Sequence, residues 1–173
     1  MANKEALREL QGRLADRLAA AKTQQRGKSW LAVECGARGF LFPLAEAGEI
    51  FPFAPVLPVP YTNRWFLGVT NLRGHLNGVV DLAAFLGVKS IETPGRDQAR
   101  LVGFNQSLEM NCALLVDRLA GLRSAEQLSS DPDETPGQPA FVGVRYRDAA
   151  GRAWQELNLA ELAGDNTFLR IVG

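Results

Sequence analysis

From Ser29 onward the chain consists of short apolar runs that are interrupted every few residues by Gly, Pro or Asn, and this spacing constrains the fold most. The runs are rich in Val, Leu, Phe and Trp, which favour strands. Gly and Pro, the residues that terminate strands and form turns, number 17 and 9 among the 173 residues. The pattern predicts an all-β barrel or sandwich as the main body of the protein.

The first part of this body is expected to contain a hairpin followed by a connector. WLAVEC (residues 30–35) and GFLFPL (residues 39–44) are strand-like runs that flank a short turn, as in a β-hairpin. Residues 44–50 are expected to form a short helical turn. Prolines then stand at positions 52, 55, 58 and 60. Because proline lacks a backbone donor, this segment is predicted to be an extended connector on the surface.

The stretch GVTNLRGHLNGVVDL (residues 68–82) predicts a strand, a turn at Arg73-Gly74-His75 and a returning strand. Asp81 is expected to cap a short helix that ends at Gly87. A second unit of the same kind follows in residues 99–117, where Asp117 stands in the corresponding place. Asp117 is therefore expected to cap another helical segment, with three apolar residues in it: Leu119, Leu122 and Leu128.

The last part of the chain is expected to form a loop, a hairpin and a short helix. Ser, Asp and Pro dominate residues 129–139, which favours a flexible loop. FVGVRYR (residues 141–147) and AWQELNL (residues 153–159) predict a closing hairpin. A short helix, AELAG, and a terminal strand or tail, TFLRIV, complete the chain.

Residues 1–27 are predicted to form an N-terminal amphipathic helix, and residues 28–173 a separate globular domain. Leucines recur in the first segment at steps of three and four, with charged residues between them: Leu7, Leu10, Leu14 and Leu18. This is the pattern of an amphipathic helix, with Asn3 as its cap and Gly27 as its end. The apolar stripe is narrow for a helix without contacts, so we expect it to dock on its own domain or on another molecule.

The start of the chain, MANKEALREL, is charged and lacks the apolar run of a signal peptide. No apolar stretch approaches the ~18 residues needed to span a membrane. We therefore expect a cytoplasmic protein that meets membranes only through a partner.

Charge and cysteine content exclude several kinds of site. Nineteen basic residues balance nineteen acidic ones, and no basic block mixed with aromatics occurs, so nucleic-acid binding is not expected. The two cysteines, Cys35 and Cys112, lie singly in apolar runs, without the spacing of a zinc site or a disulfide framework. We interpret both as reduced core residues and expect no metal and no cofactor.

Groups that carry catalysis are scarce. His75 is the only histidine, and no serine stands in the G-x-S-x-G setting of a hydrolase. Asp81 and Asp117 each end an apolar strand, and a divergent enzyme would use them as paired carboxylates. Capping of backbone donors explains both aspartates better, so the chain is not expected to be an enzyme.

Arg73 has two interpretations that the residues alone do not separate. It is either a solvated turn residue or an interface anchor, because a guanidinium held beside a glycine offers five fixed donors to a partner. Gly68, inside the preceding strand, indicates a bulge or a close approach by another backbone.

The order of Gly, Asn, Arg, Gly, Asp and Leu in GVTNLRG and VVDLAAFLG resembles the central signature of the CheW-like coupling proteins of bacterial chemosensory systems. FLFPLAEAGEIFPF, CALLVDRLAGL and FVGVRYRDAAGRAWQELNLAELA are similar to other segments of that family. The resemblance spans residues 30–164. The leucine-striped leader and the chain length are most similar to the PilI-like subgroup, which serves type IV pilus twitching motility.

This resemblance implies two five-stranded β-barrels packed side by side, without catalytic activity or cofactor. It implies an adaptor that binds the regulatory domain of a CheA-type histidine kinase and the cytoplasmic tip of a methyl-accepting chemoreceptor, and that is recruited to membrane-associated receptor arrays. By motif position, four residues match the receptor-facing region: Arg73, Asn71, Gly68 and Ala47. We add His75 to this set, because its protonation would place a second positive charge beside Arg73.

The sequence differs from the family pattern at two positions, and one other class of protein remains an alternative. Asn77 and Gly78 stand where the family usually has an apolar residue and a proline, so the returning strand is expected to be more flexible. A small β-barrel that binds RNA or a ribosomal particle is the alternative from another class of protein, and the balanced charge argues against it.

Overall fold

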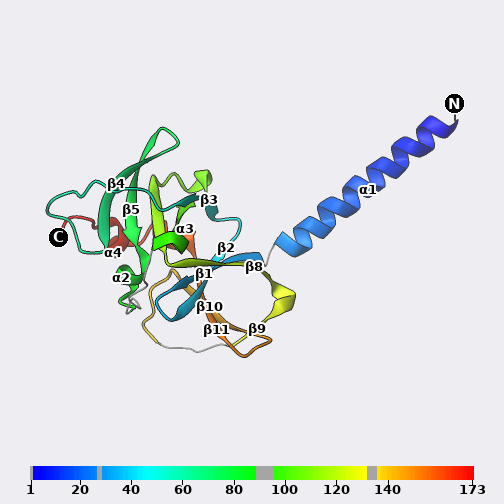
Figure 1. The fold of residues 1–173 in the computed structure, drawn as a ribbon. Helices are drawn as coiled ribbons and strands as arrows, with labels where there is room; N and C mark the ends of the chain where they lie inside the picture. Colours follow the sequence, from blue (N-terminus) through cyan, green and yellow to red (C-terminus); the bar gives the residue numbers. More distant parts are fainter. Residues whose placement is uncertain (1, 27–28, 89–95, 132–135) are drawn as a thin grey trace.

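The computed structural model describes residues 2–26, 29–88, 96–131 and 136–173, in which strands are the main regular structure after the leader. Within these residues eleven strands form one six-stranded and one five-stranded sheet. The strands are β1 (Ser29–Cys35), β2 (Arg38–Pro43), β3 (Ala47–Pro52), β4 (Phe66–Leu72), β5 (His75–Asp81), β6 (Arg100–Phe104), β7 (Cys112–Val116), β8 (Arg118–Ser124), β9 (Leu128–Ser130), β10 (Val142–Asp148) and β11 (Ala153–Leu157). The helices are α1 (Ala2–Arg26), α2 (Leu82–Leu86), α3 (Leu159–Ala163) and α4 (Asn166–Leu169). The all-β prediction is confirmed (Figure 1).

The six-stranded sheet has the order β8-β1-β2-β11-β10-β9. The predicted first hairpin is its centre, with β1 and β2 paired from Trp30↔Pro43 to Cys35↔Arg38. The two end strands, β8 and β9, are joined in the chain by residues 125–127 alone. Because so short a link cannot span a flat sheet of six strands, the sheet must curl until its ends lie close together.

The five-stranded sheet has the order β3-β6-β7-β5-β4, with β5 and β7 parallel. The proline-containing segment after β3 is extended, as predicted, and runs along the outer edge of β4. There Leu57 and Val69 exchange two backbone hydrogen bonds of 2.8 and 2.9 Å. The connector therefore leads from one end strand, β3, to the edge of the other.

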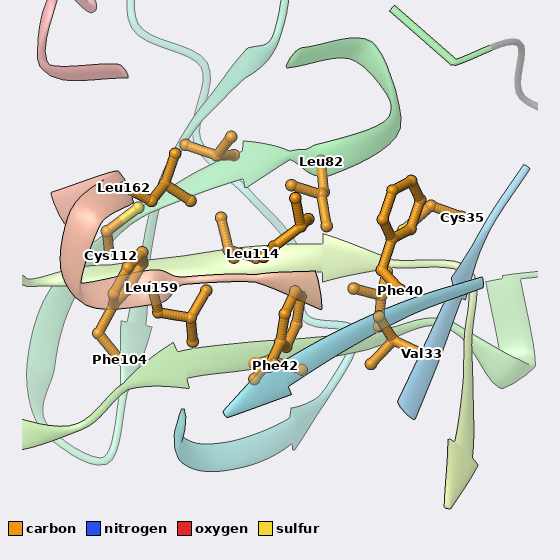
Figure 2. Close-up of a cluster of buried hydrophobic side chains, with 14 of the residues drawn as sticks. Val33, Cys35, Phe40, Phe42, Leu82, Phe104, Cys112, Leu114, Leu159 and Leu162 are labelled. Carbon is orange, nitrogen blue, oxygen red and sulfur yellow. The ribbon is translucent and has the colours of Figure 1, made fainter. Parts of the chain in front are cut away.

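The buried apolar residues form three clusters, and Figure 2 shows side chains of the largest. The largest lies between the two sheets and takes Val33 and Phe42 from the six-stranded sheet, Leu114 from the five-stranded sheet, and Leu82 and Leu159 from the short helices. Each sheet also has a smaller cluster on its other face, around Trp30 and Trp154 in one case and around Leu101 and Val79 in the other. Each sheet has apolar residues on both faces, so both faces must be covered. One face of each sheet curls around a core of its own, and the other packs on the core that the two lobes share.

The strand count differs from that implied by the family resemblance. One sheet has the five strands, and the other has six, because the three residues Leu128–Ser130 pair with β10 as β9. This strand includes the start of the segment predicted to be a loop. Residues 132–135 of that segment lie outside the described residues.

Asp117 does not cap a helix. It is followed by the strand β8, whose residues pair with β1, for example Leu122↔Leu31. The apolar spacing at Leu119 and Leu122 fits a helix as well as a bulged strand, and cross-strand pairing decides between them. A shift of register opposite Ala32 gives β8 its bulge.

Other local expectations also change. Residues 44–46 form only a turn, and Ala47–Pro52 is a strand because it pairs with β6. The terminal TFLRIV segment begins as a helix, α4, because the Asp165 carboxylate accepts a hydrogen bond from the Phe168 N–H at 2.9 Å. The helix after Asp81, ended by Gly87, is confirmed.

α1 covers Ala2–Arg26, so the predicted leader helix is present and Asn3 lies inside it rather than at its cap. The helix projects away from the sheets (Figure 1). Three leucines of its stripe are more than half exposed: Leu7, Leu10 and Leu14. Gly27, the predicted end, lies outside the described residues.

Candidate partner-binding site

The β4–β5 hairpin turns through two residues, Arg73 and Gly74, since Leu72 pairs with His75. Both turn residues have positive φ, 52° at Arg73 and 81° at Gly74, which is the geometry that matches the twist of a two-residue hairpin. The Asn71 side-chain oxygen accepts a hydrogen bond from the Gly74 N–H at 2.8 Å. Asn71 and Gly74 therefore fix the turn, and Arg73 is held in an unusual backbone conformation at its tip.

Arg73 is exposed, and its head group pairs with a carboxylate from another strand. Its Nη2 lies 2.6 Å from Oε1 of Glu49, and the two side chains are 73% and 43% exposed. Glu49 belongs to β3, at the opposite end of the sheet order from the hairpin. The contact is possible because the curled sheet brings its ends together. In solvent such a pair contributes little stability, and it places the guanidinium on the β3 side of the hairpin tip.

Beside this pair a cleft of about 640 Å³ opens between the hairpin, β3 and the β6–β7 connection. Its charged lining residues are Arg73, Glu49 and Glu109, and its polar ones include His75 and Asn77. Apolar side chains also line it: Phe51, Leu72, Phe104, Met110 and Cys112. A cleft with apolar lining and a polar rim is suited to a protein partner.

Three of the predicted site residues lie together at the hairpin tip: Asn71, Arg73 and His75, all of them exposed. Ala47 is half-buried, pairs with Phe104 and packs against the large core. Its neighbour Gly48 lines the cleft, so Ala47 lies next to the site rather than in it.

Gly68 is buried and has a structural role in this region. Its φ is 140°, and a Cβ on it would lie 2.1 Å from the Leu57 carbonyl oxygen. Both interpretations made from the sequence are confirmed, because the register shifts between Phe66 and Gly68 and the connector backbone approaches closely. Gly68 thus positions the connector against β4.

The acidic residues considered for catalysis bond to backbone groups. Asp81 Oδ1 accepts from the Ala84 N–H at 3.3 Å, and Asp117 Oδ2 accepts from the Gly36 N–H at 2.6 Å. Burial raises the pKa of the Cys35 and Cys112 thiols to about 12. Among the described residues, no group of three His, Cys, Asp or Glu side chains is placed to hold a metal ion.

Glu49 is the site residue that sequence reasoning missed. It lies in β3, which the sequence did not predict as a strand, and its pairing with Arg73 depends on the curl of the whole sheet. The residues around Glu49 in the sequence carry no signal for this contact, because its partner is brought near by the fold of the whole sheet.

The domain thus combines two β lobes with an exposed arginine beside a cleft. Residues 29–166 match the model of the CheW-like domain family, and the chain belongs to that family.

Curated relatives support this assignment. The chain is 30% identical over 165 residues to Protein PilI of Pseudomonas aeruginosa, covering 92% of this chain and 88% of that protein. It is 28% identical over 106 residues to the chemotaxis protein CheW of Rhizobium meliloti, covering 61% of this chain and 66% of that protein.

A solved structure has the same fold. The scaffolding protein TtCheW from Thermoanaerobacter tengcongensis superposes with a TM-score of 0.64 at 18% identity, covering 76% of this chain and 84% of that chain. In the part of the chain that the structure describes, no helix has the length and apolar character needed to cross a membrane.

Proposed function

We propose that this protein is a non-enzymatic adaptor that couples a methyl-accepting chemoreceptor to a CheA-type histidine kinase. The observation that carries the proposal is Arg73, exposed at a two-residue turn and paired with Glu49 beside a cleft in a CheW-like fold. The receptor-facing surface consists of the hairpin tip with Asn71, Arg73 and His75, and the adjoining cleft. The protein acts in the cytoplasm, at membrane-associated receptor arrays.

The interactions of the polar groups support the non-enzymatic part of the proposal. Asp81 and Asp117 are engaged with backbone N–H groups, and both thiols are buried with raised pKa values. His75 lies on the exposed hairpin, in the rim of the cleft. A nucleophile, a base and an oriented third group do not come together there.

We further propose that the output is type IV pilus motility. The match to Protein PilI covers 92% of the chain and leaves out about 8% of 173 residues, or roughly 14. The segment ahead of the family match is 28 residues long, residues 1–28. The similarity to that protein therefore extends into the leader helix, which the family match does not include.

The test is capture of the purified protein by the regulatory domain of each CheA-type kinase, and by the receptor tips, of its source organism. Three variants accompany it: Arg73→Glu, a deletion of residues 1–27, and Arg64→Glu as a matched charge reversal at another exposed arginine. We expect Arg73→Glu to lose receptor capture, while its free energy of unfolding, obtained from thermal melts, changes by less than about 0.5 kcal/mol. Arg64→Glu should bind like the wild type.

Two results would contradict the proposal. Failure of every kinase to capture the folded protein would mean that the fold serves another purpose here. Unfolding of Arg73→Glu, or normal receptor capture by it, would mean that Arg73 is not a binding residue.

A further inference from the structure

A second cleft, of about 540 Å³, opens on the six-stranded sheet and shares no residue with the cleft beside Arg73. Its lining consists of Ala37, Arg38, Gly39, Phe40, Gln138, Arg145, Arg152, Ala153 and Gln155. Three of these residues are arginines and none is acidic. We call this cleft the arginine groove.

Strand register defines the shape of the arginine groove. Gln155 of β11 is flanked by Phe40 on β2 and by Arg145 on β10. Because alternate residues of a strand share a face, Arg38 and Ala153 lie on the same face as these three. Neighbouring strands are about 4.8 Å apart, so Arg38 and Arg145 project from strands roughly 10 Å apart. The small side chain of Ala153 lies on the strand between them.

Two of the three arginines of the groove, Arg145 and Arg152, are engaged before any ligand arrives. Arg145 Nη2 lies 3.2 Å from Asp131 Oδ2. Arg152 pairs with Glu34 and lies over the Trp154 ring, 4.5 Å from the ring centroid. Guanidinium groups that are already ordered lose less entropy when they bind.

Among the described residues, arginines outnumber carboxylates in and beside the groove. Glu34 is shared by Arg118 and Arg152, and Asp131 by Arg145 and Arg147. Four arginines thus share two carboxylates. Arg38 is exposed and makes no hydrogen bond or ion pair within the part of the chain that is described.

We propose that the arginine groove docks a segment of a partner protein that carries closely spaced Asp or Glu side chains. Charge complementarity selects the acidic partner, since arginines are the only charged residues that line the groove within the described part of the chain. The separation of Arg38 from Arg145 selects a chain with several carboxylates over a single small anion.

The test uses the full chain, isotope-labelled for amide NMR, and an acetylated hexaglutamate peptide as the probe. Hexaglutamine serves as the uncharged control peptide. We expect hexaglutamate to shift the amide signals of residues 37–40 and 153–155, and 1 M NaCl to abolish the shifts because it screens charges beyond about 3 Å. Arg38→Glu should weaken binding by at least about tenfold. Arg64→Glu, a reversal outside the groove, should change it less than about twofold.

Several outcomes overturn the proposal. These are no binding of hexaglutamate, equal binding of hexaglutamine, equal loss in Arg38→Glu and Arg64→Glu, or signal changes confined to other surfaces. Inorganic phosphate that displaces the peptide at equal concentration would show a small-anion site instead. A thermal melt of Arg38→Glu that matches the wild type confirms that the loss is not unfolding.

Discussion

At the residue scale, the proposed receptor surface depends on a few residues that set the backbone conformation around the hairpin. Asn71 closes the turn, Gly74 permits it, and Gly68 lets the connector approach β4. Only Arg73, His75 and Asn77 present polar groups from the hairpin to the cleft. The sequence indicated that Gly68 lies at a close approach, but its motif position suggested a surface role that its burial does not support.

Gly68→Ala tests this distinction. The added Cβ would lie 2.1 Å from the Leu57 carbonyl oxygen, at a φ of 140°, so the variant should lose about 2 kcal/mol or more of stability. Gly74→Ala is the control, because its φ is 81° but no atom lies within 4 Å of the new Cβ. It should lose about 1 kcal/mol from strain alone. Equal stability of the two variants by urea unfolding would refute the structural role of Gly68.

The two thiols should be inert in the folded protein. Burial raises the pKa of Cys35 and of Cys112 to about 12, and only the thiolate reacts with disulfide reagents. At pH 8 a chromogenic disulfide reagent should therefore label neither cysteine over the time in which it labels both in urea. Rapid labelling of the native protein would show that one of the thiols is accessible.

At the scale of elements, sequence patterns predicted the strands whose apolar residues are local and missed those that depend on a distant partner. The β1–β2 hairpin, β4, β5 and the α2 helix follow from alternation and capping signals. β3 and β8 were expected to be partly helical, because their strand character comes from pairing with β6 and β1. The Glu49–Arg73 pair was invisible for the same reason.

Glu34 ties three parts of one sheet together, since the β1 carboxylate binds Arg118 of β8 and Arg152, which precedes β11. Burial raises its pKa, but hydrogen bonds and charges from Arg152 and Arg118 outweigh this and hold the pKa below 4.5. A carboxylate with a lowered pKa stabilises the fold above about pH 4.5, and this contribution is lost as pH falls through the folded-state value.

Glu34→Gln should therefore lower the free energy of unfolding by about 1–2 kcal/mol at pH 7. The loss is small because the two arginines are half-exposed. The difference from the wild type should shrink between about pH 5 and pH 3. Urea unfolding at several pH values measures it. A pH-independent difference would show that the amide changes packing rather than charge.

At the scale of the whole molecule, the shared core joins the two lobes. The largest apolar cluster takes side chains from both sheets and from the short helices. An adaptor that holds two partners in a fixed relation needs lobes that do not move independently. The sequence predicted the β class and, through the family resemblance, the two lobes, but apolar alternation cannot show which face of a sheet is shared.

The shared core predicts that the lobes unfold together. Trp30 and Trp154 lie in the six-stranded lobe, and Trp65 packs beside the five-stranded lobe against the shared core. Tryptophan fluorescence and far-UV circular dichroism should report one coincident transition in urea.

Leu114→Ala, in the middle of the shared core, should destabilise that single transition by about 2–5 kcal/mol. Leu7→Ala on the exposed leader should leave it unchanged within about 0.5 kcal/mol. Two separate transitions, or a Leu114→Ala variant that loses only one of them, would show that the lobes fold independently and that the shared cluster does not couple them.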